Sequence, residues 1–242
     1  EPDVVLATAF INMYGRCGCL DDAKLIFDLI PKKDVVSWTA IMTVYAHNGE
    51  TKKAFKLFDE MLVEGLEPDK VCCISILSAC VSKTGIDDGR LMHMRAVACA
   101  LDSDIGVMNG LIVMYGKCGS LEESTRIFKD AFKQDIILLT TMMASYAINN
   151  KVKHALDLFD KVRHTRLKPD EVTFINVLSM CSHSGMIEEG RLFFSSMSHD
   201  YNITPNIYHY SCMIDMLGRA GCLKEAEDMI NKMPCPATSL QW

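Results

Sequence analysis

Aspartates and short polar residues recur along the chain at matched distances. The aspartates follow one another at intervals of 35, 35, 31 and 35 residues, at Asp34, Asp69, Asp104, Asp135 and Asp170. A short polar residue often stands at the fifth place of the segments that these spacings define, namely at Thr8, Thr39, Asn109, Thr140 and Ser211. A carboxylate accepts hydrogen bonds, and a hydroxyl or an amide can donate as well as accept. A repeated pair of this kind is able to contact a series of similar polar ligand groups.

No pattern in the sequence is typical of a metal site or of an enzyme. The chain lacks Cys-x-x-Cys, His-Glu-x-x-His and His-x-Glu, and no Ser/His/Asp constellation is traceable. Several of the 11 cysteines recur at equivalent places, such as Cys17 with Cys118 and Cys80 with Cys181. We interpret them as small packing residues in a reducing compartment. We predict no catalytic residue, no metal and no cofactor within these 242 residues.

The composition indicates a folded chain that does not span a membrane. Hydrophobic residues make up 49% of the chain, and no run approaches the roughly 18 consecutive apolar residues of a membrane helix. The formal net charge is −6, from 25 Lys+Arg against 31 Asp+Glu. An acidic balance argues against nucleic-acid binding by the chain as a whole, unless the basic residues gather on one wall.

The chain is internally duplicated at an offset of 101 residues. The sequence MYGRCG at 13–18 returns as MYGKCG at 114–119, and LSAC at 77–80 returns as LSMC at 178–181. The aspartate spacing divides the chain further. After 1–3, interpreted as the end of a preceding repeat, the expected units are 4–34, 35–69, 70–104, 105–135, 136–170, 171–206 and 207–238, and 239–242 would begin a further C-terminal extension.

Every unit has the pattern of two helices. In 35–69 the first apolar stripe comprises Val36, Trp38, Ile41, Met42 and Tyr45. After a break at 47–49, the second stripe comprises Ala54, Leu57, Phe58 and Met61, and it ends before Gly65 and Pro68. Neither helix can bury its stripe alone. We therefore predict an all-α fold in which helix-turn-helix pairs stack into an α-solenoid.

Two solenoid families have periods of this length. Tetratricopeptide repeats hold about 34 residues per unit, but their pattern lacks both the cycle of unit lengths seen here and the Gly-x-x-Pro-Asp ending at 65–69. The segments DVVSWTAIMTVYAHNG, ILSACVSKTGIDDGRLMH and MNGLIVMYGKCGSLEESTRIF resemble the P, L and S units of plant pentatricopeptide repeat (PPR) proteins of the PLS subclass. The closing HYSCMIDMLGRAGCLKEAEDMINKMP resembles the last S unit of RNA-editing factors in that subclass. The implied order is S-P-L-S-P-L-S in a right-handed α-solenoid.

The resemblance implies that the chain binds single-stranded RNA with one base per repeat. The fifth residue and the closing residue of a unit would select the base: Thr8 with Asp34, Thr39 with Asp69, Asn109 with Asp135, Thr140 with Asp170, and Ser211 in the last unit. Thr with Asp favours guanine, which has two donors on its pairing edge, and Asn with Asp favours uracil, which has one. The implied target is G-G-n-U-G-n-n. We expect these side chains to point into one shared groove, although an aspartate at a unit's end also suits a helix N-cap.

Two further sets of residues have a role implied by the resemblance. The second residue of a unit would pack on base faces, as Val5, Val36 and Ile137 could, whereas Gly106 offers no side chain. Cations at the end of the first helix in the S units, Arg16, Lys117 and Arg219, would contact phosphates. Ordinary helix packing is the alternative for the first set. Stabilisation of the helix C-terminal dipole is the alternative for the second.

The same resemblance implies that the chain specifies a site for cytidine-to-uridine editing in a mitochondrion or chloroplast. A targeting peptide and any deaminase domain would lie outside these residues, and organellar editing-factor proteins would bind through the L units. Ile74 and Ile175 hold the fifth place in those units and cannot hydrogen-bond a base. The units closed by Asn206 and Thr238 stay unassigned. The alternatives are a factor for splicing or transcript stability and a protein-binding scaffold.

Overall fold

The computed structural model describes residues 4–81, 85–132, 135–163 and 167–234, which form fourteen α-helices and no strand. The helices are α1 (Val4–Arg16), α2 (Leu20–Asp28), α3 (Val35–His47), α4 (Thr51–Val63), α5 (Lys70–Ala79), α6 (Ile86–Ala98), α7 (Ile105–Cys118), α8 (Leu121–Asp130), α9 (Ile136–Ile148), α10 (Val152–Arg163), α11 (Glu171–Ser184), α12 (Ile187–His199), α13 (Ile207–Arg219) and α14 (Leu223–Lys232). Among the described residues, no helix combines the length and the apolar character needed to cross a bilayer. Residues 1–3, Thr238 and 239–242 lie outside the described part of the chain.

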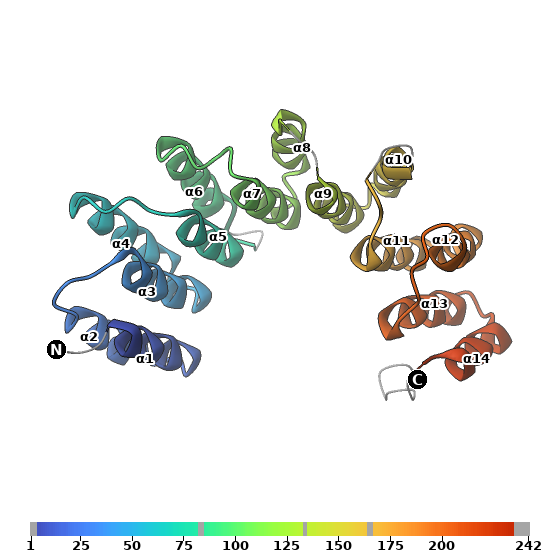
Figure 1. Cartoon of the computed structure of the whole chain (residues 1–242), viewed down its shortest axis with the longest axis horizontal. Coiled ribbons are helices and arrows are strands. Elements are labelled where there is room, and N and C mark those ends of the chain that lie inside the picture. The colour runs from blue at the N-terminus through green and yellow to red at the C-terminus, as the bar shows by residue number, and fades with distance from the viewer. Residues whose placement is uncertain (1–3, 82–84, 133–134, 164–166, 235–242) are drawn as a thin grey trace. The chain divides into compact units, whose positions relative to one another are not determined.

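The chain divides into two compact units, and each is a stack of helical hairpins. Glu1–Phe132 holds α1 to α8, and Lys133–Trp242 holds α9 to α14. In the first unit, α1, α3, α5 and α7 pack side by side as the first helices of successive hairpins (Figure 1). In the second unit α9, α11 and α13 stack in the same way, and each second helix packs on the first helix of its own hairpin. The all-α solenoid architecture predicted from the repeat is confirmed within each unit.

The apolar stripes predicted for 35–69 form the core with one exception. On α4, Ala54, Leu57, Phe58 and Met61 are all buried. On α3 the predicted stripe is also buried, except that Val36 is 61% exposed and does not belong to it. Val36 lies in the first turn of α3, next to the exposed capping residue Asp34, so the neighbouring helices do not cover it.

Close approach between helices explains several glycines. A Cβ atom on Gly15 of α1 would collide with the Val44 side chain of α3, and one on Gly89 of α6 would collide with Met114 of α7. Gly190, the duplicate of Gly89, stands in the same relation to a methionine of α13. Gly15 lets α1 and α3 pack closely, because a larger residue would meet the branched side chain of Val44. At Gly89 and Gly190 the flexible end of the methionine would have to move instead.

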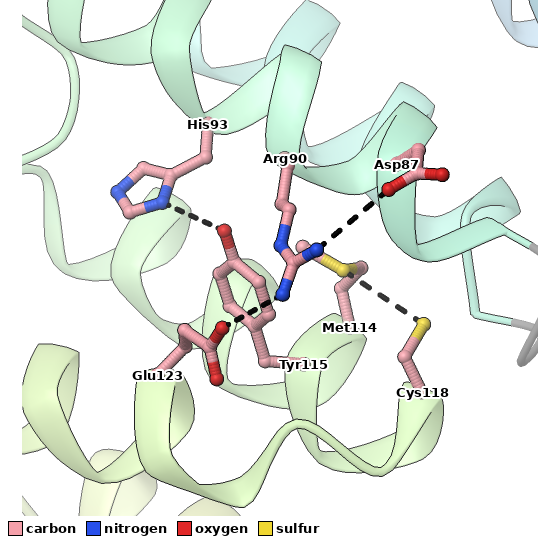
Figure 2. Close-up of polar contacts among 7 residues, drawn as sticks. All are labelled: Asp87, Arg90, His93, Met114, Tyr115, Cys118 and Glu123. Carbon is pink, nitrogen blue, oxygen red and sulfur yellow. Dashed lines mark hydrogen bonds and ion pairs between the residues drawn. The ribbon is translucent and has the colours of Figure 1, made fainter.

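Charged residues tie the hairpin of α5 and α6 to the hairpin of α7 and α8 (Figure 2). Arg90 of α6 donates to Glu123 of α8 at 3.0 Å, and His93 Nδ1 lies 3.0 Å from the hydroxyl of Tyr115 on α7. The hydrogen bond from Arg90 lowers the pKa of Glu123. In the second unit the duplicated arginine, Arg191 of α12, makes the equivalent bond to Glu225 of α14 at 2.8 Å. These duplicated arginines therefore connect repeats.

Candidate nucleic-acid interface

The aspartates that close the predicted units cap the helices that follow them. Oδ1 accepts a hydrogen bond from the backbone N–H three residues on, at 2.8 to 2.9 Å, in Asp34, Asp69, Asp135 and Asp170. The capping interpretation is therefore confirmed. Capping uses only one oxygen of each carboxylate. Oδ2 of these four residues makes no hydrogen bond or ion pair to any described residue. Each keeps an acceptor for a further donor.

The residues that close 70–104 and 171–206 cap the helix that follows and also have other partners. Asp104 Oδ1 accepts from two backbone N–H groups of α7, and its Oδ2 lies 3.5 Å from Lys70 Nζ. Asn206 accepts from a backbone N–H of α13 at 3.1 Å and donates to Glu171 at 2.9 Å. Neither side chain has an uncommitted oxygen like those of the four aspartates.

In two repeats the polar residue at the fifth place of the first helix hydrogen-bonds to the backbone of its own helix. Thr8 Oγ1 donates to the carbonyl of Val4 at 2.7 Å, and Ser211 Oγ donates to the carbonyl of Ile207 at 2.8 Å. A carbonyl only accepts, so the single hydroxyl hydrogen is spent on the helix backbone. The hydroxyl oxygen of Thr8 still has lone pairs that can accept a hydrogen bond.

Thr39 and Asn109, at the same place in α3 and α7, hold polar atoms without a hydrogen bond. Thr39 Oγ1 and Asn109 Oδ1 are buried and have no hydrogen-bond partner among the described residues. Thr39 lies beside the Cys72 thiol, and burial raises the pKa of that thiol to about 12, so it stays protonated and is a weak partner. Buried polar atoms are ordinarily paired, and a bound ligand is one explanation for those that are not.

Thr140 of α9 hydrogen-bonds across to the neighbouring first helix. Its Oγ1 lies 3.1 Å from Oγ1 of Thr173 on α11, and Thr173 Oγ1 lies 2.6 Å from Oδ1 of Asp170. Thr140 and Asp170 are the two residues proposed from the sequence to act together in 136–170. The structure brings them to the two sides of Thr173, which the sequence reasoning did not single out.

The fifth residues are more deeply placed than an open groove would require. Thr140 is only 7% exposed, and the buried atoms of Thr39 and Asn109 have no access to water. All three lie on the first helix of a hairpin. Within each of the two compact parts of the chain they therefore belong to the layer of first helices. The reason for their depth is that a short side chain reaches only as far as the neighbouring first helix. The aspartates Asp34, Asp69 and Asp170 beside them are exposed.

The second residue of the first helix is exposed and apolar in six of the seven helices. The predicted residues Val5, Val36 and Ile137 are 76%, 61% and 57% exposed. Three more occupy the same place and were not predicted: Val71, Val172 and Tyr208. Their common position, two residues after each capping residue, is the sequence signal that identifies them. A solvent-exposed apolar residue at one helical position in successive repeats forms a row of contact sites within each unit.

Gly106 holds the second place in α7, and the structure shows why no side chain stands there. A Cβ atom on Gly106 would meet Ile74 Cδ1 at 3.1 Å and Asp104 Oδ1 at 3.0 Å. Ile74, the fifth residue of the preceding L unit, therefore occupies part of the space beside α7. A larger residue at 106 would displace either this isoleucine or the cap.

The cations at the ends of the first helices have unequal surroundings. Arg16 and Lys117 are exposed in the last turns of α1 and α7, and neither forms an ion pair with a described residue. Arg219 instead pairs with Asp215 on its own helix at 2.9 Å. The same place in α3 and α11 holds exposed histidines, His47 and His183, which the sequence reasoning did not include. No group of three or more metal-ligating side chains occurs among the described residues.

Family models match most of the chain. The models described as PPR repeat family, pentatricopeptide repeat domain and PPR repeat match residues 33–82, 126–184 and 201–234, and a further PPR repeat model matches 5–35, 107–136 and 172–200. This chain belongs to the pentatricopeptide repeat family. The matches at 5–35, 107–136, 172–200 and 201–234 each cover one hairpin described above, and the alternative of a tetratricopeptide repeat protein is not supported.

Relatives in Arabidopsis thaliana are similar over nearly the whole chain. The chloroplastic PPR-containing protein CRR2 is 38% identical over 95% of this chain, and the mitochondrial PPR-containing protein At4g19191 is 37% identical over 100% of it. The chain covers 35% and 37% of these relatives. It therefore spans about a third of the length of the curated PPR proteins it matches.

A solved structure shares the fold. The crystal structure of PPR10 from maize matches 100% of this chain with a TM-score of 0.79 and 17% sequence identity, and the match covers 35% of PPR10. PPR10 has also been solved in complex with an 18-nt psaJ RNA element, with a TM-score of 0.73 to this chain. At this level of identity the likeness shows the solenoid fold of PPR repeats alone.

Proposed function

We propose that this chain binds single-stranded RNA and that each repeat contacts one nucleotide. The observation that carries the proposal is the row of exposed apolar side chains at the second place, each of which, apart from Val5, lies near a described capping residue at the start of the same helix. Val5, Val36 and Val71 form the row in the first unit, and Ile137, Val172 and Tyr208 form it in the second. Unpaired bases have apolar faces and polar edges, so they need an apolar surface beside hydrogen-bonding groups.

The polar pairs supply the proposed base preference. An Asp oxygen and a threonine hydroxyl both accept, which suits the two donors on the pairing edge of guanine. The pairs Thr8 with Asp34, Thr39 with Asp69, and Thr140 with Asp170 would then prefer guanine. Asn109 with Asp135 would prefer uracil. With the L units and the last unit unassigned, the proposed target is G-G-n-U-G-n-n.

Phosphate contacts would supply much of the affinity in spite of the net charge of −6. The exposed Arg16 and Lys117 are the cations best suited to this, and His47 and His183 occupy the same place in other first helices. Arg219 is a weaker candidate because it already pairs with Asp215. Duplicated arginines that join hairpins, such as Arg90, are excluded from this role by their partners.

The biological role we propose is specification of a cytidine-to-uridine editing site in a plant mitochondrion or chloroplast. The support is the PLS order of unit lengths, the form of the last S unit and the organellar names of the relatives. The deamination itself would be performed by another domain or by a partner. The L units, whose fifth residues Ile74 and Ile175 bind no base edge, would be available for editing-factor proteins.

Binding of short RNA oligonucleotides to the purified chain tests the proposal. We expect fluorescence anisotropy to give tighter binding for an oligonucleotide containing G-G-n-U-G-n-n than for a scrambled one of the same composition. Duplex DNA of the same sequence is the control for simple charge attraction. Equal binding of the two RNAs would refute base reading, and no binding to any RNA would favour a protein-binding scaffold.

A further inference from the structure

We propose that Thr173 fixes the hydroxyl hydrogen of Thr140 and thereby makes the 136–170 repeat discriminate guanine from adenine. Thr173 is a positioning residue in this proposal, because it acts on the base through Thr140 and Asp170. The proposal rests on the proposed function and deepens it for one repeat. Its basis is a chain of three hydrogen-bonded side chains that joins α9 to the start of α11.

The direction of each hydrogen bond in this chain follows from the available hydrogens. An ionised carboxylate only accepts, so the 2.6 Å contact to Asp170 Oδ1 uses the single hydroxyl hydrogen of Thr173. Thr173 Oγ1 then has only lone pairs to offer. It accepts from the backbone N–H of Asp170 at 3.3 Å, and it must accept from Thr140 Oγ1 at 3.1 Å. Thr140 is therefore the donor in its bond to Thr173.

This arrangement leaves Thr140 with lone pairs and no hydrogen for a ligand. Asp170 Oδ2 is likewise an acceptor, and Thr173 is fully buried at 0% exposure, so water does not compete for its oxygen. The pair presents two acceptors. Guanine matches two acceptors with N1–H and the N2 amino group, whereas adenine presents the N1 lone pair in place of the N1–H. Adenine would set one lone pair against another, which costs binding free energy.

The 35–69 repeat offers a natural comparison with these three hydrogen-bonded side chains. Thr39 and Asp69 are the same residue types as Thr140 and Asp170, but Cys72 stands where Thr173 stands. Thr39 Oγ1 has only the weakly hydrogen-bonding Cys72 thiol beside it and no oxygen or nitrogen partner among the described residues, so no strong bond fixes its hydroxyl hydrogen. A rotating hydroxyl can accept from guanine or donate to adenine. We therefore expect the 35–69 repeat to discriminate these two purines less well than the 136–170 repeat.

Thr8 shows that the hydrogen can be committed in another way. Its hydroxyl donates to the Val4 carbonyl, so it too presents lone pairs only. Ser37, the residue equivalent to Thr173, instead uses its hydroxyl in bonds with the backbone of Asp34. In the 4–34 and 136–170 repeats the threonine therefore has only lone pairs to offer a ligand, although a different bond uses its hydrogen in each. The threonine of the 35–69 repeat is not fixed in this way.

Substitution of Thr173 in the whole chain tests the proposal. Thr173→Val keeps the side-chain volume and removes the oxygen, and Thr173→Ser keeps the oxygen. Cys72→Ser is the matched gain variant, because it places a hydroxyl beside Thr39. The measurement is the ratio of dissociation constants for RNAs with guanine or adenine at the fifth nucleotide of G-G-n-U-G-n-n, and at the second nucleotide for Cys72→Ser. Thermal melting of each variant reports any loss of the helix cap.

We expect Thr173→Val to lower the guanine-to-adenine ratio at the fifth nucleotide about tenfold and leave the ratio at the second unchanged. Thr173→Ser should keep the wild-type ratio, and Cys72→Ser should raise the ratio at the second nucleotide severalfold. An unchanged ratio in both Thr173→Val and Cys72→Ser would overturn the proposal, as would equal weakening for all four bases. Failure of the wild-type chain to bind RNA would overturn the proposed function as well, so the two failures are distinguishable.

Discussion

Arg95 of α6 donates to both carboxylate oxygens of Asp59 on α4, at 2.8 Å to each. Its guanidinium also lies over the ring of Phe55, 4.7 Å from the centroid. Both bonds come from one nitrogen, Nη2, and Nη1 is buried without a hydrogen-bond partner among the described residues. What a lysine ammonium would lack is therefore the planar face over the ring. The second helices of two neighbouring repeats are therefore joined by one side chain that has a specific geometric requirement.

We predict that Arg95→Lys lowers the free energy of unfolding by about 1 kcal/mol, because it keeps the charge and loses the stacking of the guanidinium on the ring of Phe55. Urea denaturation followed by circular dichroism measures this. Arg126→Lys, at an exposed residue of α8, is the matched control and should change little. Equal stability of the two variants would show that the Arg95 geometry contributes nothing beyond its charge.

Asp69 can be tested for its two roles separately. Asparagine is as good an N-cap as aspartate, so Asp69→Asn should keep the melting temperature while it replaces the free acceptor by an amide. Asp69→Ala should lose about 1 kcal/mol of stability as well. For both variants we expect weaker preference for guanine at the second nucleotide, measured with a four-base panel. A loss of affinity that is the same for all four bases would mean that Asp69 acts as a cap alone.

Asn109 carries the proposed preference for uracil. We predict that Asn109→Thr shifts the preference at the fourth nucleotide from uracil toward guanine, because the amide that matches the single donor of uracil is replaced by a hydroxyl. Competition binding with the four bases at that nucleotide measures the shift. The second nucleotide serves as the internal control, and its preference should not move. A panel that is identical before and after the change would contradict the assignment.

The exposed second residues can be changed with little expected effect on folding. Val36 is 61% exposed, so Val36→Asp should leave the melting temperature nearly unchanged and weaken RNA binding by adding charge repulsion and removing apolar contact. Val63→Asp is the control on α4, where the valine is 88% exposed. It should affect neither property. Equal loss of RNA binding in both variants would indicate a general charge effect.

Two histidines make stability depend on pH. Burial lowers the pKa of His93 and of His209 below the usual value of 6.5. The unfolded chain therefore binds protons at a higher pH than the folded chain, so the contribution is fully present above about 6.5 and is lost as pH falls through the folded pKa values. We expect chemical denaturation at pH 7.5 and 5.5 to show this loss. His93→Gln and His209→Gln should reduce the difference between the two pH values.

The repeat and its helices could be predicted from the sequence because their causes are local. A 3.6-residue apolar period, a capping aspartate and a glycine after the helix act within a few residues of one another. The sequence left Val36 with two interpretations, as part of the apolar stripe and as a residue that packs on bases. A residue in the first helical turn fits the apolar period, but whether it is covered depends on the neighbouring hairpin.

The polar pairs of the candidate interface could be predicted only in part. The residue types at Thr140 and Asp170 are visible in the sequence, but the bonds that join them to Thr173 arise from the contact of α9 with α11. No local pattern specifies such a contact. The ion pair of Arg219 with Asp215, by contrast, spans four residues on one helix and is a pairing that sequence spacing alone can suggest.

The duplicated bonds from Arg90 to Glu123 and from Arg191 to Glu225 bear on how such a protein can be re-engineered. Each one fastens the second helix of one repeat, 70–104 or 171–206, to the second helix of the repeat after it. Moving either of these repeats alone into another protein would break this ion pair. The practical building block in this chain is therefore larger than one repeat, because Arg95 also joins the 70–104 repeat to the 35–69 repeat before it.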